Sequence, residues 1–397
     1  MPPFSRRSFL SLAAASSLYG RRAWGSDWAA IEAQARGQRI YFNAWAGSET
    51  VNAYIAWAGS QLAQRFGIEL QHVKIADTAE VVRRVRDEVA AGKREGSVDL
   101  VWINGENFRA MKAERLLFGP FTEALPNYRY VDTEAKPTTI IDFAEGVEGL
   151  ESPWGMAQLT FFGDGAKIPA PPGSMMELVE FAAANPGRVT YPAPPDFHGT
   201  AFLKQVLAET IADASIFSIS VSQAQFLAMA EPWFAMLDRL HPHFWRQGKQ
   251  FPQSQGQLKQ MLADGELLMA LTFNPNEPAN LVASGELPLS TIAWQHRDGT
   301  IGNTHFVAIP INARAKAAAQ VAANFLLSPE AQARKADLKV WGDPTVLALS
   351  KLAPDDAKLF GQAVVAGGVG EPAPAIPEPH ASFVPLIEAA WLERYGT

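Results

Sequence analysis

The sequence predicts an α/β protein of two lobes, each an open, mostly parallel sheet flanked by helices. Three observations support this prediction. The chain has 397 residues, 48% of them hydrophobic, and this length exceeds what a single hydrophobic core usually supports. Strand-like and helix-like segments alternate between residues 38 and 103, an order typical of an open α/β lobe. A second set of such segments begins after Pro153-Trp154-Gly155.

The first lobe is predicted from periodic apolar patterns. Short apolar runs predict the strands, and apolar residues three and four apart predict the helices. The mostly apolar run at 97–103 is typical of a parallel strand that is covered on both faces. In chain order we expect a helix at 28–36, a strand at 38–43, a helix at 49–66, a strand at 68–73, a helix at 77–91 and a strand at 97–103.

The second lobe is predicted from the same patterns, with proline-rich loops between them. A proline-rich stretch at 371–379 reads as a surface strap. In chain order we expect a helix at 175–184, a strand at 188–191, helices at 200–211 and 258–262, strands at 266–273, 292–295 and 304–309, and helices at 313–327 and 384–395.

The N-terminus has the pattern of a twin-arginine export signal. Arg6-Arg7 stands directly before an apolar run of about ten residues at 9–18, which is too short for the roughly 20 residues that cross a membrane. Ala23-Trp24-Gly25 offers a small-residue cleavage site before Ser26. We therefore expect residues 1–25 to be a Tat-type signal peptide and the mature protein to be periplasmic.

Composition excludes several kinds of site. The chain contains no cysteine, so disulfides, thiolate metal ligands, a thiol nucleophile and a lipid anchor on cysteine are all excluded. The net charge is −7, and removing the four arginines before Ser26 gives −7 − 4 = −11 for the mature chain. An acidic chain disfavours nucleic acid as a partner.

Several segments in a fixed order resemble the extracellular solute-binding proteins of ABC importers, family 1, with the class II fold. The most diagnostic is the helix end Leu327-Ser328-Pro329-Glu330-Ala331-Gln332, which follows the strand His305-Phe306-Val307-Ala308-Ile309. Asn43-Ala44-Trp45, the strand at 98–102, Gly265-Glu266, the loop at 191–200 and Asn274-Pro275-Asn276-Glu277 occur in the same order. The chain most resembles the YnjB-like branch of this family.

The resemblance implies a two-lobe, periplasmic-binding-protein-like fold of type II with a hinge of two or three crossover strands. Crossings near Ser152, Asp298 and Val340 would divide the chain into lobe I (26–152 and 299–340) and lobe II (153–298 and 341–397). Ligands of open α/β sheets bind beyond the carboxyl ends of the strands. We therefore expect an interlobe cleft that closes on its ligand by a hinge motion.

That geometry selects the polar and aromatic residues that follow the strands or lie at the crossover. They are expected to bind ligand through amides, carboxylates, aromatic rings and helix N-termini. The candidates are Asn43, Trp45, Gly47, Ser48, Asn104, Glu106, Asn107, Trp154, Gln158, Asp196, Phe197, Thr200, Asn274, Asn276, Glu277, Asn303 and Thr304.

Structural alternatives remain open for the main candidates. Ser48 fits equally well as a helix cap with Trp45 packed on a neighbour. Glu106 fits as an acid in the first turn of a helix at 107–113, where the helix dipole stabilises it. Trp154 fits as a buried aromatic between the lobes, because large aromatic side chains are commonly buried.

No catalytic set is evident, so we expect no enzyme activity, no cofactor and no metal. His241-Pro242-His243 lacks an adjacent acid or cysteine, which disfavours zinc. A secreted glycoside-active enzyme that uses Glu106 and Glu277 is an alternative, because a carboxylate pair needs no local motif. A periplasmic sensor component is the second alternative.

The expected ligand is a small polar solute. An organic cation such as a polyamine or a thiamine-like compound ranks first, because Glu106, Glu277 and Trp154 offer charge pairing and π contact. A sugar ranks second and an inorganic oxyanion third. Iron is disfavoured, because the family's iron binders usually present paired tyrosines and the seven tyrosines here include no adjacent pair. The resemblance implies a membrane permease and its ATPase as partners of a monomer.

Overall fold

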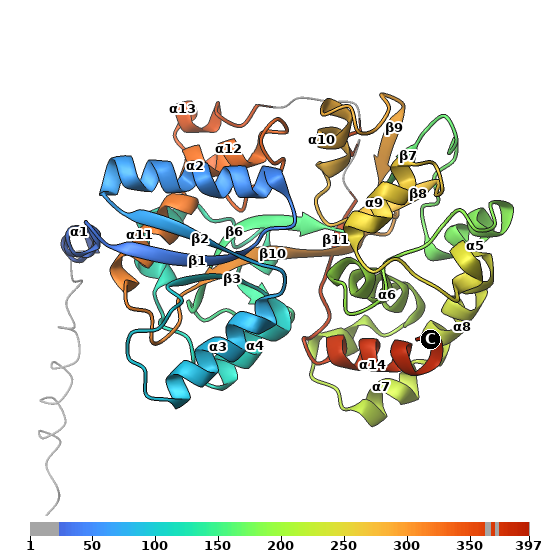
Figure 1. The fold of residues 1–397 in the computed structure, drawn as a ribbon, viewed down its shortest axis with the longest axis horizontal. Coiled ribbons are helices and arrows are strands. Elements are labelled where there is room, and N and C mark those ends of the chain that lie inside the picture. The colour runs from blue at the N-terminus through green and yellow to red at the C-terminus, as the bar shows by residue number, and fades with distance from the viewer. Residues whose placement is uncertain (1–23, 362–366, 370–372, 397) are drawn as a thin grey trace, which may run out of the picture.

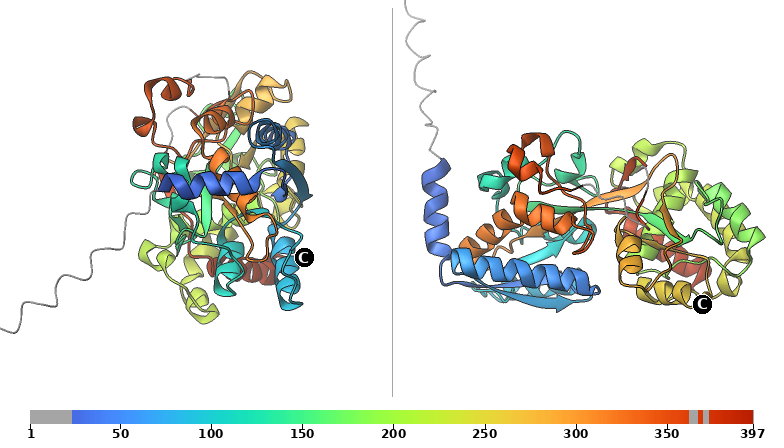
Figure 2. Two further views of the ribbon diagram at one scale, coloured as in Figure 1. Left: turned by 90° about the vertical axis from the view of Figure 1, so that its left-hand side faces the viewer. Right: turned by 90° about the horizontal axis from the view of Figure 1, so that it is seen from above.

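The computed structural model describes residues 24–361, 367–369 and 373–396. Two lobes lie side by side, and strands run between them (Figure 1). The view from above in Figure 2 shows the same two bodies joined by these strands. The expected signal peptide lies outside the described residues, except for its last two residues, which begin α1 (Trp24–Ala35).

Lobe I is built on a sheet whose strands follow the order predicted from the sequence. β1 pairs in parallel with β2 and with β3, and the antiparallel β10 extends the sheet. The bounds of the elements are β1 (Arg39–Trp45), α2 (Glu49–Phe66), β2 (Glu69–Ile75), α3 (Thr78–Ala90), β3 (Leu100–Ile103), α4 (Gly105–Ala113), β4 (Ile141–Asp142), β5 (Glu145–Gly146), α11 (Lys316–Leu326), α12 (Pro329–Ala336) and α13 (Pro354–Ala357).

Lobe II has a smaller sheet, and its direction corrects the prediction of a mostly parallel sheet in each lobe. The central strand β7 pairs antiparallel with both β8 and β9. β7 carries the chain away from the hinge, and its two neighbours bring the chain back. The elements are β7 (Thr160–Asp164), α5 (Met175–Ala184), α6 (Phe197–Thr210), α7 (Gln223–Met229), α8 (Glu231–Leu240), α9 (Gln255–Ala263), β8 (Met269–Thr272), α10 (Glu277–Ala283), β9 (Thr291–Trp294) and α14 (Phe383–Tyr395).

The strand predicted at 188–191 is not formed. These residues make single backbone hydrogen bonds to two different segments: Leu268 N donates to Arg188 O at 2.9 Å, and Trp245 N donates to Val189 O at 2.8 Å. A ladder needs repeated pairing with one neighbour. The apolar pattern therefore reflects burial rather than a place in the sheet.

The hinge consists of β6 (Glu151–Gln158) and β10 (Thr300–Ala308), which pair antiparallel along most of their length. Each strand contributes side chains to both hydrophobic cores. Trp154 and Val307 pack in the core of lobe I, whereas Ala157 and Ile301 pack in the core of lobe II. The short strand β11 (Ala375–Pro377) lies in parallel along β10 and forms a third connection.

The last expected crossing falls later in the chain than Val340. Trp341, Val346, Leu347 and Leu352 belong to the core of lobe I, together with residues of α2 and α11. The segment that begins at residue 341 therefore packs on lobe I, and the return to lobe II follows through β11 and α14. Within the described ranges, no helix has the length and apolar character needed to cross a bilayer.

Candidate functional site

Glu106 lies at the N-terminus of α4 in lobe I and is the centre of an acidic region between the lobes. Its side chain is exposed, yet protein surrounds it closely enough that desolvation raises the pKa of its carboxyl. Glu388 and Glu378 of the C-terminal segment raise this pKa further, whereas its own backbone N–H and the Lys204 ammonium of α6 lower it. Charged groups on α6 and in the C-terminal segment therefore act electrostatically on the Glu106 carboxyl group of lobe I.

Lys204 and Glu378 form a buried ion pair beside Glu106. Lys204 Nζ lies 2.5 Å from Glu378 Oε2, and both side chains are only 1% exposed. The ammonium also lies 4.6 Å from the ring centroid of Phe143 and 5.6 Å from that of Phe197. These distances fit cation–π contacts on two rings. Phe143 itself fits against Gly105, where a Cβ atom would lie 2.6 Å from the ring.

Glu388 on α14 is the acid of lobe II whose charge acts on Glu106 together with that of Glu378. Thr200 Oγ1 donates to Glu388 Oε1 at 2.7 Å. Desolvation raises the pKa of Glu388, and Asp77, the N-cap of α3 in lobe I, raises it further. The hydrogen bond from Thr200 and the charge of Lys204 oppose the rise. Acids from both lobes thus repel one another across this region, which a bound positive charge would relieve.

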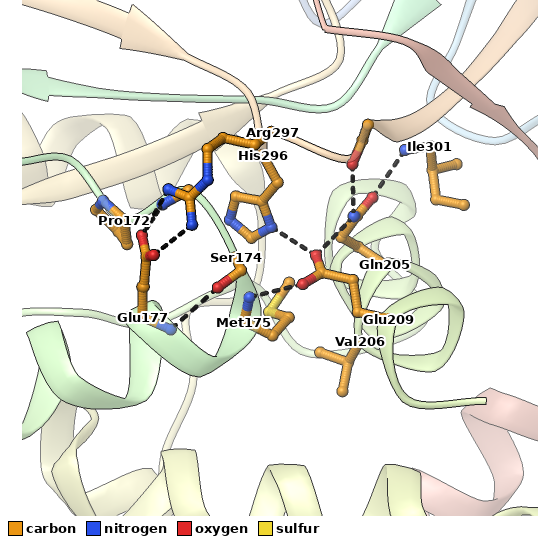
Figure 3. A network of polar contacts seen from close by, with 12 residues as sticks. Pro172, Ser174, Met175, Glu177, Gln205, Val206, Glu209, His296, Arg297 and Ile301 are labelled. Atoms are coloured by element: carbon orange, nitrogen blue, oxygen red, sulfur yellow. Dashed lines mark hydrogen bonds and ion pairs between the residues drawn. The ribbon is translucent and has the colours of Figure 1, made fainter. Parts of the chain in front are cut away.

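A polar network holds α6 to the hinge and so fixes the position of Lys204 (Figure 3). Gln205 Oε1 accepts from Ile301 N at 2.8 Å, and Gln205 Nε2 donates to Gly299 O at 3.1 Å. Glu209 Oε1 lies 2.5 Å from His296 Nδ1. The backbone just before and at the start of β10 is therefore bonded directly to Gln205. Glu209 of the same helix, which also carries Phe197, Thr200 and Lys204, bonds the side chain of His296.

Five of the residues selected from the sequence lie in this acidic region. Asn107 Nδ2 lies 3.5 Å from Glu106 Oε1, and Asn303 Nδ2 donates to Glu378 Oε1 at 3.0 Å. Phe197 is 39% exposed at the N-terminus of α6, and Thr200 lies one turn further on. We call Glu106, Asn107, Phe197, Thr200, Asn303, Lys204, Glu378 and Glu388 the cleft cluster.

The candidates at the end of β1, and Asn104 after β3, contact other residues of lobe I. Asn43 Oδ1 accepts from Arg84 at 3.3 Å, and the Trp45 ring meets Trp102 edge-on with centroids 6.5 Å apart. The Trp45 ring also covers Gly47. Ser48 is the N-cap residue of α2, with its hydroxyl 2.7 Å from Thr50 Oγ1, and Asn104 is the N-cap residue of α4.

The candidates at 274–277 are engaged by protein groups. Asn274 Nδ2 donates to Trp341 O at 3.0 Å, and Asn276 Nδ2 donates to Gly342 O at 2.5 Å. These amides tie lobe II to the segment that packs on lobe I. Glu277 pairs with Lys259 Nζ at 2.6 Å; desolvation raises its pKa, but the charge and hydrogen bond of Lys259 outweigh this and lower it. Glu277 therefore has a structural role as the ion-pair partner of Lys259. This ion pair does not join it to the cleft cluster.

Three further candidates have internal roles. Asp196 caps α6, where its Oδ1 accepts from His198 N at 2.9 Å and from Gly199 N at 3.2 Å. Gln158 Nε2 donates to the carbonyl oxygens of Ala373 and Pro374, which fastens the strap to the hinge. Thr304 is buried and lies 3.0 Å from Thr138 through their hydroxyl oxygens.

Trp154 is a core residue, so the prediction that it stacks on a ligand is wrong for this structure. It is 0% exposed and its ring is enclosed by aromatic neighbours. Its centroid lies 5.0 Å from that of Trp102 and 5.5 Å from that of Trp341. The alternative interpretation, a buried aromatic at the crossover, is the one that the geometry supports.

We expect Trp154→Phe to lower the free energy of unfolding by about 1–3 kcal/mol, because the smaller ring leaves a cavity in the lobe I core. Trp45→Phe is the matched control. Trp45 is 36% exposed, so its replacement should cost less than about 0.5 kcal/mol. Urea unfolding of both variants measures the difference, and equal costs would contradict the core assignment.

Sequence reasoning missed Lys204, Glu378, Glu388 and Phe143. None of them follows a strand that was predicted to end at the cleft. Lys204 had a detectable feature, since it is a lone lysine among mostly apolar residues of α6. The other three come from the strap, the C-terminal helix and a short hairpin, whose sequences carry no comparable pattern.

Comparison with known proteins places the chain in a family. The model of the bacterial extracellular solute-binding protein family matches residues 57–360. The protein YnjB of Escherichia coli (strain K12) is 46% identical over 382 residues, which cover 96% of this chain and 97% of that protein. This similarity confirms the resemblance to the YnjB-like branch.

Solved structures with the same fold are more distant in sequence. The periplasmic binding protein AfuA of Actinobacillus pleuropneumoniae, solved with fructose-6-phosphate, is 15% identical with a TM-score of 0.61. The spermidine/putrescine ABC transporter substrate-binding protein PotD of Streptococcus pneumoniae is 14% identical with a TM-score of 0.60. Both alignments cover 90% of this chain and 98% of the other chain.

These similarities confirm the predicted two-lobe α/β fold of the periplasmic binding proteins. They also favour the binding function over the alternative of a glycoside-active enzyme, because the family model matches residues 57–360 and the relative aligns over 96% of this chain. The chain belongs to the bacterial extracellular solute-binding protein family.

Proposed function

We propose that this protein captures a small organic cation between its lobes and delivers it to an ABC importer. The observation that carries the proposal is the charge of the cleft cluster. Glu378 pairs with the ammonium of Lys204, the charge of Lys204 also acts on Glu106 and Glu388, and the carboxyl group of Asp77 acts on Glu388. A ligand with positive charge offsets this excess of acid, whereas an oxyanion would add to it.

The aromatic rings support the same class of ligand. Phe197 is partly exposed at the mouth of the cluster, and its ring already lies near one ammonium, that of Lys204. A second cation beside this ring would gain the same kind of attraction. The fold by itself does not determine the ligand. Of the two solved structures above, one contains fructose-6-phosphate and the other is a protein named for spermidine and putrescine.

Delivery would follow from closure of the hinge. β6 and β10 join the two cores, so a small rotation about them would bring α4 and α6 together. A ligand held by Glu106 of lobe I and Glu388 of lobe II binds better when both acids reach it, which favours the closed state. The closed protein would then present its lobes, as a monomer, to a membrane permease with its ATPase. Export through a twin-arginine signal would place it in the periplasm.

A thermal unfolding panel tests the ligand class. The protein beginning at Ser26 is unfolded and refolded to remove bound ligand, then heated with spermidine, thiamine, maltose or phosphate. A ligand at 100 times its dissociation constant adds about 2.7 kcal/mol of stability, which raises the midpoint by a few degrees. We expect a shift with a cation. A shift with maltose or phosphate alone would contradict the proposal.

Affinity for a cation should fall as the pH decreases. Desolvation raises the pKa values of Glu106 and Glu388 in the free protein, whereas a bound cation favours their ionised forms and lowers those values. Binding is therefore strongest above the raised pKa values and weakens below them, at a pH higher than that at which an ordinary glutamate titrates, about 4.3.

Calorimetric titration with spermidine between pH 8 and pH 5 measures this effect, because alkylamines stay protonated throughout that range. Thermal unfolding without ligand at each pH is the control for stability. An affinity that stays constant or rises toward pH 5 would show that these carboxylates do not hold the cation.

A further inference from the structure

A small pocket borders the cleft cluster at the hinge. Its volume is about 100 Å³, and its walls come from the hairpin of β4 and β5, from β10 and from the residues around the end of β11. Asn303 and Glu378 belong to both the pocket and the cleft cluster, and Phe143 of the pocket wall contacts Lys204 of the cluster. The pocket is therefore continuous with the charged groups described above.

Asn303, a residue of the pocket wall, carries a buried polar atom without a partner in the described part of the chain. Asn303 is only 4% exposed, and its Nδ2 donates to Glu378 Oε1 at 3.0 Å. Its Oδ1 atom accepts no hydrogen bond from any group in residues 24–361, 367–369 and 373–396. A buried acceptor without a donor destabilises the protein, because it has lost its hydrogen bonds to water. A ligand that brings an N–H or O–H group would remove this cost.

The rest of the pocket is mostly apolar. Ile141, Pro137 and Pro377 line it beside the Phe143 ring. Phe143 and Ala144 form the two-residue turn of the hairpin with φ values of 43° and 63°, a left-handed conformation that costs energy for residues other than glycine. This turn presents the Phe143 ring between the pocket and Lys204.

We propose that the pocket is a subsite for the amine end of the ligand, with N–H groups donated to Asn303 Oδ1 and the adjoining carbon chain placed against Ile141 and Phe143. The carboxylate of Glu378, which also pairs with Lys204, lies beside the same amide. The subsite rests on the proposed function and narrows the ligand class to cations that carry N–H donors on an apolar chain. Quaternary ammonium compounds of equal charge fit it poorly, because they have no N–H group.

The test places a larger side chain at the edge of the pocket, so that it occupies the space proposed for the ligand. Ile141 is 45% exposed and lines the pocket, whereas the neighbouring Ile140 is 39% exposed and does not. Ile141→Trp and Ile140→Trp are therefore a matched pair of surface substitutions that leave the polar groups unchanged. Calorimetric titration of both variants and the wild-type protein uses spermidine and its fully N-methylated quaternary analogue as probes.

We expect Ile141→Trp to weaken spermidine binding by about tenfold or more, and Ile140→Trp to change it by less than about twofold. The wild-type protein should prefer spermidine to the quaternary analogue by at least about tenfold. Equal affinities of the two tryptophan variants for spermidine, or no preference in the wild-type protein, would overturn the subsite alone. If the wild-type protein binds neither probe, the subsite is overturned, and the proposed function falls as well when thiamine gives no shift in the thermal unfolding panel.

Discussion

Replacement of both Glu106 and Glu388 by glutamine should weaken spermidine binding by at least about 100-fold. The two carboxylates belong to α4 of lobe I and α14 of lobe II, and the charge of Glu388 acts on Glu106. A charged hydrogen bond contributes about 1.5–3 kcal/mol, so the loss of two removes about 3–6 kcal/mol of binding free energy, and every 1.4 kcal/mol is tenfold in affinity.

The same substitutions should leave the fold intact, because glutamine has nearly the same shape and removes repulsion between acids. Glu231→Gln is the matched control, since Glu231 is an exposed acid in the first turn of α8. Calorimetry measures affinity and urea unfolding measures stability for each protein. A folded double variant that binds spermidine as tightly as wild type would contradict the assignment of the site.

Lys204→Met should be the most destabilising single change in the cleft cluster. Lys204 and Glu378 are each 1% exposed in their ion pair, and removal of one partner of a buried pair leaves an uncompensated charge, at a cost of about 3–5 kcal/mol. The double variant Lys204→Met/Glu378→Gln should recover a large part of this loss, because no unpaired charge then remains buried.

Urea unfolding of wild type, both single variants and the double variant measures the coupling between the two side chains. Lys259→Met is a useful comparison. The Lys259 side chain pairs with Glu277 but is 25% exposed, so its replacement should lower the free energy of unfolding by less than that of Lys204. If Lys204→Met changed stability no more than Lys259→Met, the pair would not be the buried anchor that the geometry indicates.

Much of the fold was predictable because its first lobe follows local rules. The helix predicted at 49–66 has those bounds in α2, and the pattern from β1 to β3 forms the predicted parallel sheet. Strand direction in lobe II was not predictable in this way. Periodicity reports which side chains are buried, and it carries no information on which neighbour a strand pairs with. The run at 188–191 was misread for the same reason.

The site was predictable where a residue follows a strand, lies at the start of a predicted helix, as Phe197 and Thr200 do, or lies at the chain's return to lobe I, as Asn303 does. Glu106 was found because it lies just beyond β3. Trp154 was misassigned because an aromatic residue at a crossover suits a core as well as a cleft. Glu388 was missed because it lies within the C-terminal helix and does not follow a strand. Only the folded chain brings it next to Thr200.

Competition in native mass spectrometry tests the central claim most directly. The refolded protein beginning at Ser26 is mixed with equal amounts of spermidine, thiamine, maltose and phosphate, and the mass of the bound compound identifies it. We predict a complex with one of the two cations, and its loss in the Glu106→Gln/Glu388→Gln variant. A complex with maltose or phosphate alone, or no complex with a cation, would contradict the account.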